Sequence, residues 1–203
     1  MRVVLTISLL LTLEFCYGQN KSEVKTFETR CDSIYKNKGY RVVLQHFPDG
    51  IGANSDVNTV FQFIRTAGKE REIVHQDTIY SRTGEIEFKD FNNDGVKDLL
   101  IQNTSDVRSN WTYYLYLVDS LNNNLKKVKG FDEIKNPRYL SRYHLIDNYV
   151  NSGRNWTSFY RIVNDTIKDL KIVIYDDQNN DDKSTYEQEY KKAIAKIVAE
   201  TSR

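Results

Sequence analysis

The sequence predicts a mainly β protein, with propeller-like or sandwich-like antiparallel sheets and an α-helix at the C-terminus. Tyrosine is abundant, at 14 of 203 residues, whereas proline occurs only twice. Short runs of Tyr, Phe, Ile and Val are separated by Asn, Asp, Gly and Ser, which is typical of strands joined by turns. A long segment also recurs further along the chain, as expected of a protein built from similar β-units.

The C-terminal helix is predicted over residues 185–200. Ser184 is suited to cap it, because Glu187 follows three residues later in the spacing of a capping box. One face of that helix is apolar, and we expect this face to pack on a sheet. The apolar positions are Tyr186, Tyr190, Ala193, Ile194, Ile197 and Val198.

Strands are expected wherever apolar and polar residues alternate between turn signals. The segment 21–38 is ambiguous, because its apolar residues recur at helical spacing and favour a short amphipathic helix. The turn around Gly68 predicts a hairpin between its two neighbouring strands. The expected strands are 41–46, 59–66, 71–80, 85–89, 99–102, 112–119, 145–150, 158–163 and 170–175.

The N-terminus has the layout of a secretory signal peptide over residues 1–18. Arg2 precedes an apolar run over residues 3–13, and the small Gly18 precedes a plausible cleavage point. The apolar run is too short for an ordinary transmembrane helix, and no other apolar run could span a membrane. We therefore expect a periplasmic or secreted protein. Lipidation at Cys16 is disfavoured, because Glu14 and Phe15 occupy positions where a lipobox has small residues.

The remaining residues, 19–203, are long enough for a single β-rich domain with a core of its own. A formal net charge of +1 argues against a nucleic-acid partner. Cys31 is the only cysteine of that segment, so an intramolecular disulfide is excluded and the thiol is expected to be buried.

Two units, about 98–128 and 143–173, match without a gap. The triplet Asn110–Thr112 (Asn-Trp-Thr) recurs at Asn155–Thr157, and these triplets hold the only two tryptophans. The period is close to that of a propeller blade or of a three- to four-stranded sheet unit. The alternative is coincidence between two hairpins of similar composition.

The strongest chemical signal is an acidic loop over residues 90–98. Oxygen-bearing side chains occur at its first, third, fifth and ninth positions, and Gly95 at the sixth permits a sharp turn. Calcium prefers six to eight oxygen ligands, and the seventh residue can supply a backbone carbonyl. The predicted Ca²⁺ ligands are Asp90, Asn92, Asp94, Val96 through its carbonyl oxygen, and Asp98 directly or through water.

The loop differs from an EF-hand, because Ile101 stands where that motif has a bidentate glutamate. The competing interpretation is an ordinary Asn-Asp-Gly turn without an ion. Projecting the loop forward by the repeat offset places Lys135 opposite Asp90 and Pro137 opposite Asn92. Only the first unit is therefore expected to bind metal, and the acidic run 177–181 is expected to be a solvated loop.

The pattern from Asp90 to Leu99 resembles the calcium loop of FG-GAP and VCBS-type repeats. The wider layout, roughly residues 84–175, is similar to periplasmic, calcium-binding, propeller-like proteins of Gram-negative bacteria. This resemblance implies strands flanking the loop and a structural ion. Because some members are immunity proteins, it also implies a lysozyme-like cell-wall hydrolase as a partner.

We expect a non-enzymatic protein. His46, His75 and His144 are placed in separate predicted strands, and no nucleophile or phosphate-binding motif occurs. The main hypothesis is an exported, calcium-binding protein-binding module of the envelope, with inhibition of a cell-wall hydrolase as its specific form. The first alternative is a glycan- or protein-binding module for adhesion or assembly. The second is an uncharacterised hydrolase.

Overall fold

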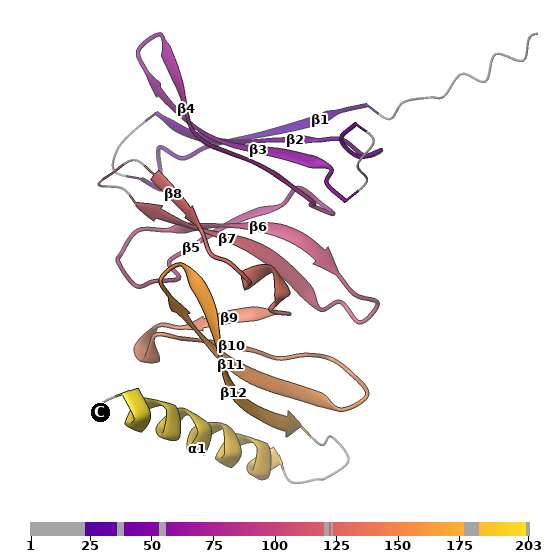
Figure 1. Cartoon of the computed structure of the whole chain (residues 1–203), viewed down its shortest axis with the longest axis vertical. Coiled ribbons are helices and arrows are strands. Elements are labelled where there is room, and N and C mark those ends of the chain that lie inside the picture. The colour runs from indigo at the N-terminus through magenta and orange to yellow at the C-terminus, as the bar shows by residue number, and fades with distance from the viewer. Residues whose placement is uncertain are drawn as a thin grey trace, which may run out of the picture.

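The computed structural model describes residues 23–35, 39–52, 56–119, 122, 124–176 and 183–201. It consists of three four-stranded antiparallel sheets followed by one α-helix, so the predicted fold class is confirmed (Figure 1). The predicted signal peptide and the acidic run 177–181 lie outside the described residues.

Each sheet is a meander, in which strands consecutive in sequence are neighbours in space. The first sheet contains β1 (Lys25–Arg30), β2 (Tyr40–His46), β3 (Thr59–Ala67) and β4 (Glu70–Ile79). The second contains β5 (Ile86–Lys89), β6 (Asp98–Ser105), β7 (Trp111–Asp119) and β8 (Asn124–Lys127). The third contains β9 (Pro137–Leu140), β10 (Leu145–Asn148), β11 (Asn155–Val163) and β12 (Thr166–Asp176). Short 3-10 turns lie at Phe131–Glu133 and Ser141–Tyr143, and α1 spans Lys183–Thr201.

The helical interpretation of residues 21–38 is wrong, because β1 forms there instead. Its six residues pair with β2, with Phe27 opposite Leu44. β1 is a largely exposed edge strand, so its own pattern carries little of the alternation that identifies buried strands. Cys31, just after β1, is fully buried as expected, and burial raises the pKa of its thiol to about 11.

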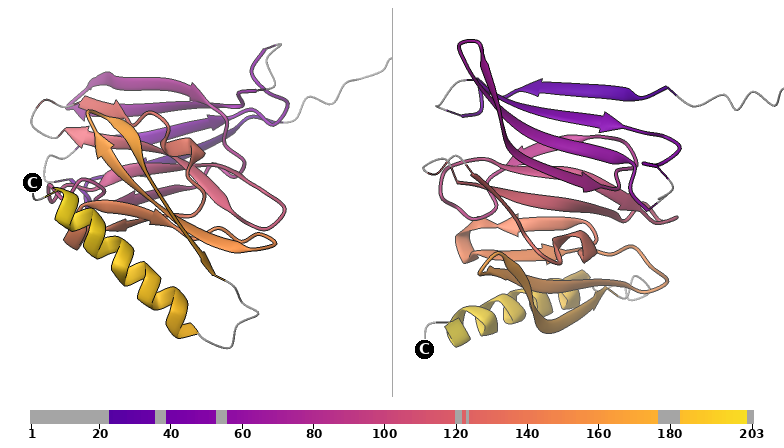
Figure 2. Two further views of the ribbon diagram at one scale, coloured as in Figure 1. Left: turned by 60° about the horizontal axis from the view of Figure 1, so that its bottom comes forward. Right: turned by 45° about the horizontal axis from the view of Figure 1, so that its top comes forward.

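The three sheets and the helix stack as four layers (Figures 1 and 2). The central sheet is covered on both faces, which explains why three consecutive residues of β6, Leu99–Ile101, are apolar. Leu99 and Ile101 pack against the first sheet, whereas Leu100 packs toward the third. α1 covers the outer face of the third sheet, where its Ala193 and Ile197 meet Phe159. The described sheets are open, and a propeller-like arrangement stays a prediction.

The matched Asn-Trp-Thr triplets open corresponding strands, β7 and β11. Trp111 pairs with Ser105 in one sheet, and Trp156 pairs with Val150 in the next. The two asparagines bind loop backbone: Asn110 Oδ1 accepts a hydrogen bond from Asn151 N at 2.8 Å, and Asn155 Oδ1 accepts one from Ser152 N at 2.9 Å. That the two units form an internal repeat stays a prediction.

A buried tyrosine links the first sheet to the second. Tyr116 Oη donates to Asp77 Oδ2 at 2.7 Å, and Lys127 Nζ contacts the same oxygen at 2.7 Å. Burial raises the pKa of Asp77, but the bonds from Lys127 and Tyr116 outweigh it and leave the pKa below the usual 3.8. A lowered carboxylate pKa stabilises the fold above pH 3.8, and this contribution is lost as the pH falls through the native pKa.

We expect Tyr116→Phe to lower the free energy of unfolding by about 1–3 kcal/mol at neutral pH, because it leaves a partly buried carboxylate without one donor. The loss should shrink as the pH falls below 3.8, when Asp77 becomes protonated. Urea denaturation at two pH values measures both effects, with Tyr175→Phe as a control on an exposed tyrosine. An equal loss at both pH values would contradict the role of the Asp77 charge.

Candidate metal centre

The acidic loop joins β5 to β6 within the central sheet. The last pair of that hairpin is Lys89 opposite Asp98, so residues 90–97 form the connection between two hydrogen-bonded strands. Asn93 and Gly95 have φ angles of 62° and 81°, in the left-handed region that glycine adopts freely and asparagine tolerates. The chain can therefore reverse direction twice within a few residues.

Side-chain oxygens of the loop are held by its own backbone. Asp90 accepts hydrogen bonds from Asn93 N at 2.6 Å and from Gly95 N at 3.0 Å. Asp94 Oδ1 accepts one from Val96 N at 2.7 Å, and Asn92 Oδ1 accepts one from Asp94 N at 3.1 Å. These local bonds fold the polar side chains of the first, third and fifth positions into the loop.

Asp98 holds the end of the loop through hydrogen bonds made by its buried carboxylate. It is fully buried, and its two carboxylate oxygens accept hydrogen bonds from Phe91 N at 2.7 Å and from Val118 N at 3.0 Å. Burial, together with the charges of Asp94 and Asp90, raises its pKa to about 7, although the two N–H donors act in the opposite direction. Asp98 thus joins the two ends of the loop to β7, and each of its oxygens keeps a further lone pair.

Several aspartates elsewhere in the fold form ion pairs with basic side chains, unlike those of the acidic loop. Asp77, Asp106, Asp147 and Asp169 each contact a lysine or an arginine. Among the described residues, Asp90, Asp94 and Asp98 make no such ion pair, although their charges lie close enough to raise the pKa of Asp98. Three neighbouring carboxylates without a cationic side chain favour an external cation.

Val96 differs from the other four predicted ligands in having an apolar side chain. That side chain packs against the core between the first two sheets, so only its backbone carbonyl can serve an ion. The hydroxyl of Tyr35 donates to the carbonyl of Lys97 at 2.9 Å, which fixes the loop against the first sheet. The four polar predicted ligands and the backbone carbonyl of Val96 therefore belong to one short segment whose position is fixed by hydrogen bonds.

The donor set fits calcium in kind, because it combines carboxylate, amide and carbonyl oxygens. Within the described part of the chain, no three Asp, Glu, His or Cys side chains by themselves form a metal-holding group. Asn92 and the carbonyl of Val96 are therefore needed to complete a shell. When bound, the ion would offset two of the three carboxylate charges and link β5 to β6.

A cavity of about 350 Å³ lies beside the loop, and Asn92, Asp94 and Val96 form part of its wall. Sequence reasoning missed two acidic residues that line the same cavity, Asp119 and Asp165. No spacing in the sequence indicates them, because Asp119 ends β7 in the second sheet and Asp165 lies between β11 and β12 in the third.

The equivalent connection in the third sheet, between β9 and β10, contains no carboxylate. It consists of Ser141, Arg142, Tyr143 and His144. The projection that placed residues 135–143 opposite the acidic loop needs correction, because β9 occupies Pro137–Leu140 within that range. The ungapped match between the two units therefore does not extend back to the strand before each connection. The connection of residues 141–144 in the third sheet is shorter than that of residues 90–97 in the second.

The three histidines lie far apart in the topology. His46 and His75 are on β2 and β4, where burial lowers the pKa of each imidazole. His144 follows a 3-10 turn, with a φ of 48°, so its placement within a strand was wrong. Among the described helices, none is both long and apolar enough to cross a bilayer.

Comparison with known proteins finds a distant structural similarity and no sequence relative. No family model matches the chain, and no curated protein matches it. Among solved structures, one from Xanthomonas, described as a type IV secretion system related protein, is 14% identical. The match covers 70% of this chain and 80% of that chain, with a TM-score of 0.43. At this score the likeness carries no argument about function.

Proposed function

We propose that this protein is an exported, non-enzymatic calcium-binding module of the cell envelope that binds another protein. The observation that carries the proposal is the segment from Asp90 to Asp98, whose three carboxylates make no ion pair with a cationic side chain among the described residues. A bound ion would stabilise this connection between β5 and β6 within the central sheet. The FG-GAP and VCBS-like pattern of the loop supports the same proposal.

An exposed, rigid hairpin loop supports protein binding as the activity. The connection between β6 and β7 carries Val107 at its tip, with a relative exposure of 101%. Asp106 holds this loop in shape: it accepts hydrogen bonds from Arg108 N at 2.9 Å and Asn110 N at 3.1 Å, and Lys135 Nζ contacts it at 2.8 Å. A preorganised loop with an apolar tip loses little conformational entropy when a partner binds it.

We further propose that the partner is a lysozyme-like cell-wall hydrolase. The test is inhibition of a panel of such enzymes by the purified protein in millimolar calcium. We expect inhibition by the wild type and a loss of about tenfold or more for Val107→Asp, because a charge placed in an apolar interface is costly.

Val163→Asp is the matched control, since Val163 is also exposed but lies at the end of β11. If no hydrolase is inhibited at micromolar protein, the inhibitor form of the proposal fails. That result would not decide calcium binding, which is tested separately by the melting temperature in calcium and in chelator. Equal inhibition by Val107→Asp would exclude this loop as the binding surface.

A further inference from the structure

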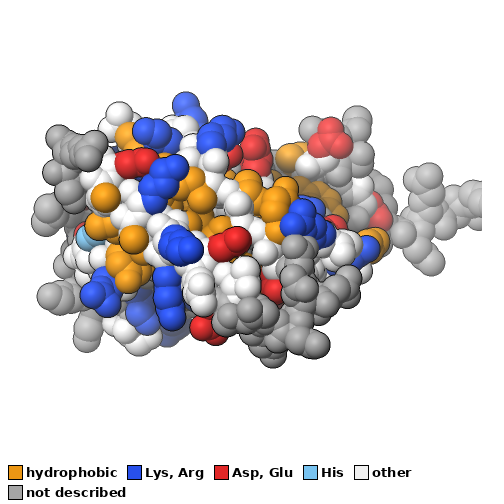
Figure 3. All heavy atoms as spheres, turned by 90° about the horizontal axis from the view of Figure 1, so that it is seen from below, with side chains coloured by type: hydrophobic (Ala, Val, Ile, Leu, Met, Phe, Trp, Pro, Cys, Tyr) orange, Lys and Arg blue, Asp and Glu red, His pale blue; other side chains and the backbone are white. Residues whose placement is uncertain are grey.

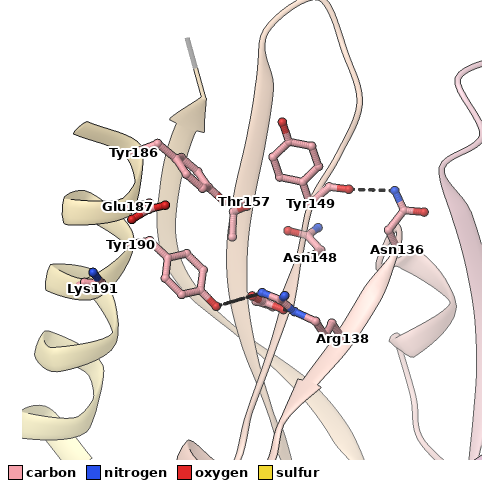
Figure 4. A pocket seen from close by; sticks show the side chains of 10 residues that line it. Asn136, Arg138, Asn148, Tyr149, Thr157, Tyr186, Glu187, Tyr190 and Lys191 are labelled. Carbon is pink, nitrogen blue, oxygen red and sulfur yellow. Dashed lines mark hydrogen bonds and ion pairs between the residues drawn. The ribbon is translucent and has the colours of Figure 1, made fainter. Parts of the chain in front are cut away.

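A second cavity, unrelated to the acidic loop in sequence, lies between α1 and the third sheet. Its volume is about 430 Å³ (Figure 4). α1 contributes Tyr186 and Tyr190, the residue after β10 contributes Tyr149, and the edge strand β9 contributes Arg138. Aromatic rings from two elements therefore face a common space, beside a charged group from a third.

The rings at this cavity are fixed by hydrogen bonds to the sheet. Tyr186 Oη lies 2.8 Å from Thr157 Oγ1, and Tyr190 Oη donates to Asp147 Oδ2 at 2.5 Å. Tyr149 and Tyr186 are nearly perpendicular, with centroids 6.3 Å apart. Because their polar ends are already bonded, the rings need not reorganise to receive a ligand.

The charges around the cavity cancel in pairs. Arg138 makes a two-point contact with Asp147, with Nε to Oδ1 at 3.0 Å and Nη2 to Oδ2 at 2.6 Å. At the mouth, Glu187 and Lys191 are exposed one helical turn apart, and each brings one charge of opposite sign. A wall with no net charge selects neither an anion nor a cation.

One buried donor at the cavity has no partner. Asn148 is 2% exposed, and its Nδ2 makes no hydrogen bond with any described residue. Figure 4 shows its amide between Tyr149 and Arg138. Buried polar groups are almost always satisfied by protein, water or ligand, so an oxygen-rich ligand at this cavity could supply the missing acceptor.

A further cavity of about 450 Å³ lies on the other side of the edge strand β9, toward the central sheet. It includes Lys89, Asp90 and Tyr139 and shares Arg138 with the first cavity. Pro137 of β9 has no N–H to offer to an added strand. The proline therefore disfavours a peptide that would pair with the edge.

We infer that this groove along β9 and α1 binds an uncharged oligosaccharide. Fixed tyrosine rings can pack against the apolar faces of sugar rings, while Arg138 and Asn148 donate to hydroxyl oxygens. The balanced charge of the cavity wall matches a neutral glycan chain. This binding site is distinct from the calcium loop and from the exposed hairpin loop proposed to contact a protein.

Isothermal titration calorimetry with a β-1,4-linked N-acetylglucosamine hexamer and with cellohexaose tests the inference. Heparin and polylysine serve as charged polymers. We expect the protein to bind at least one of the two neutral hexamers. Tyr186→Ala should weaken that binding about tenfold, whereas Tyr186→Phe, which keeps the ring, should weaken it much less.

Tyr175→Ala is the matched control, because Tyr175 is an exposed tyrosine of β12 outside the groove. If Tyr186→Ala fails to fold, NMR of the wild type replaces it, and the neutral hexamer should then shift the signals of Tyr186 and the Arg138 Nε–H. Three results would overturn the inference: no neutral hexamer bound at millimolar concentration, binding of a charged polymer alone, or unchanged binding by folded Tyr186→Ala.

Discussion

In 10 mM calcium, the melting temperature of the protein is expected to rise by about 3–11 °C over its value in chelator. Extracellular calcium modules bind with dissociation constants near 0.1–1 mM, so this concentration is about 10 to 100 times the constant. A ligand at that excess stabilises the native state by about 1.4–2.7 kcal/mol. For a domain of this size, each kcal/mol shifts the melting temperature by about 2–4 °C.

Asp94→Asn should abolish most of that rise, because it removes a carboxylate from the loop while keeping a side chain of the same shape. Asp169→Asn is the control, since Asp169 contacts Lys171 in a different sheet. Differential scanning calorimetry with calcium, magnesium and chelator measures the rise and its selectivity. A wild type that melts at the same temperature in calcium and chelator would remove the basis for the proposed metal centre.

Phe131→Ala is expected to lower the free energy of unfolding by about 3–5 kcal/mol, the usual cost of emptying a large aromatic position in a core. Phe131 is fully buried between the second and third sheets. Its ring lies edge-on to Phe91, with centroids 5.4 Å apart at 86°. Urea denaturation measures the loss directly.

This substitution should also weaken calcium binding. Phe91 follows the first predicted ligand and donates its N–H to Asp98, so a displaced Phe91 would loosen the buried end of the loop. Val163→Ala is the control, and for this exposed residue we expect a change within about 0.5 kcal/mol. A loss below 1 kcal/mol for Phe131→Ala would mean that the two sheets pack without depending on this ring.

Much of the fold could be predicted because its strands carry local patterns. β7 alternates Tyr and Leu with the period of a strand, and the apolar face of α1 recurs at helical spacing. β1 could not be predicted, because an exposed edge strand has no face that must be apolar. The stacking order of the sheets depends on contacts between residues far apart in sequence, which no local pattern records.

The candidate metal centre could be predicted because its expected ligands are alternate residues within one short segment of the chain. Spacing alone therefore places Asp90, Asn92 and Asp94 on one turn. The hydrogen bond from Val118 N to Asp98 was not visible, since it crosses to another strand. The tyrosine-lined groove was also hidden, because Arg138, Tyr149 and Tyr186 come from three elements that meet only in the folded chain.

The position of α1 has a consequence for assembly. In a stack of similar sheets, the outer face of the last sheet resembles the faces that are buried between the sheets. Another layer can therefore pack on that outer face. In this chain α1 takes the place of that layer over Leu145, Phe159 and Ile174. The helix thus occupies the face on which another sheet would otherwise stack.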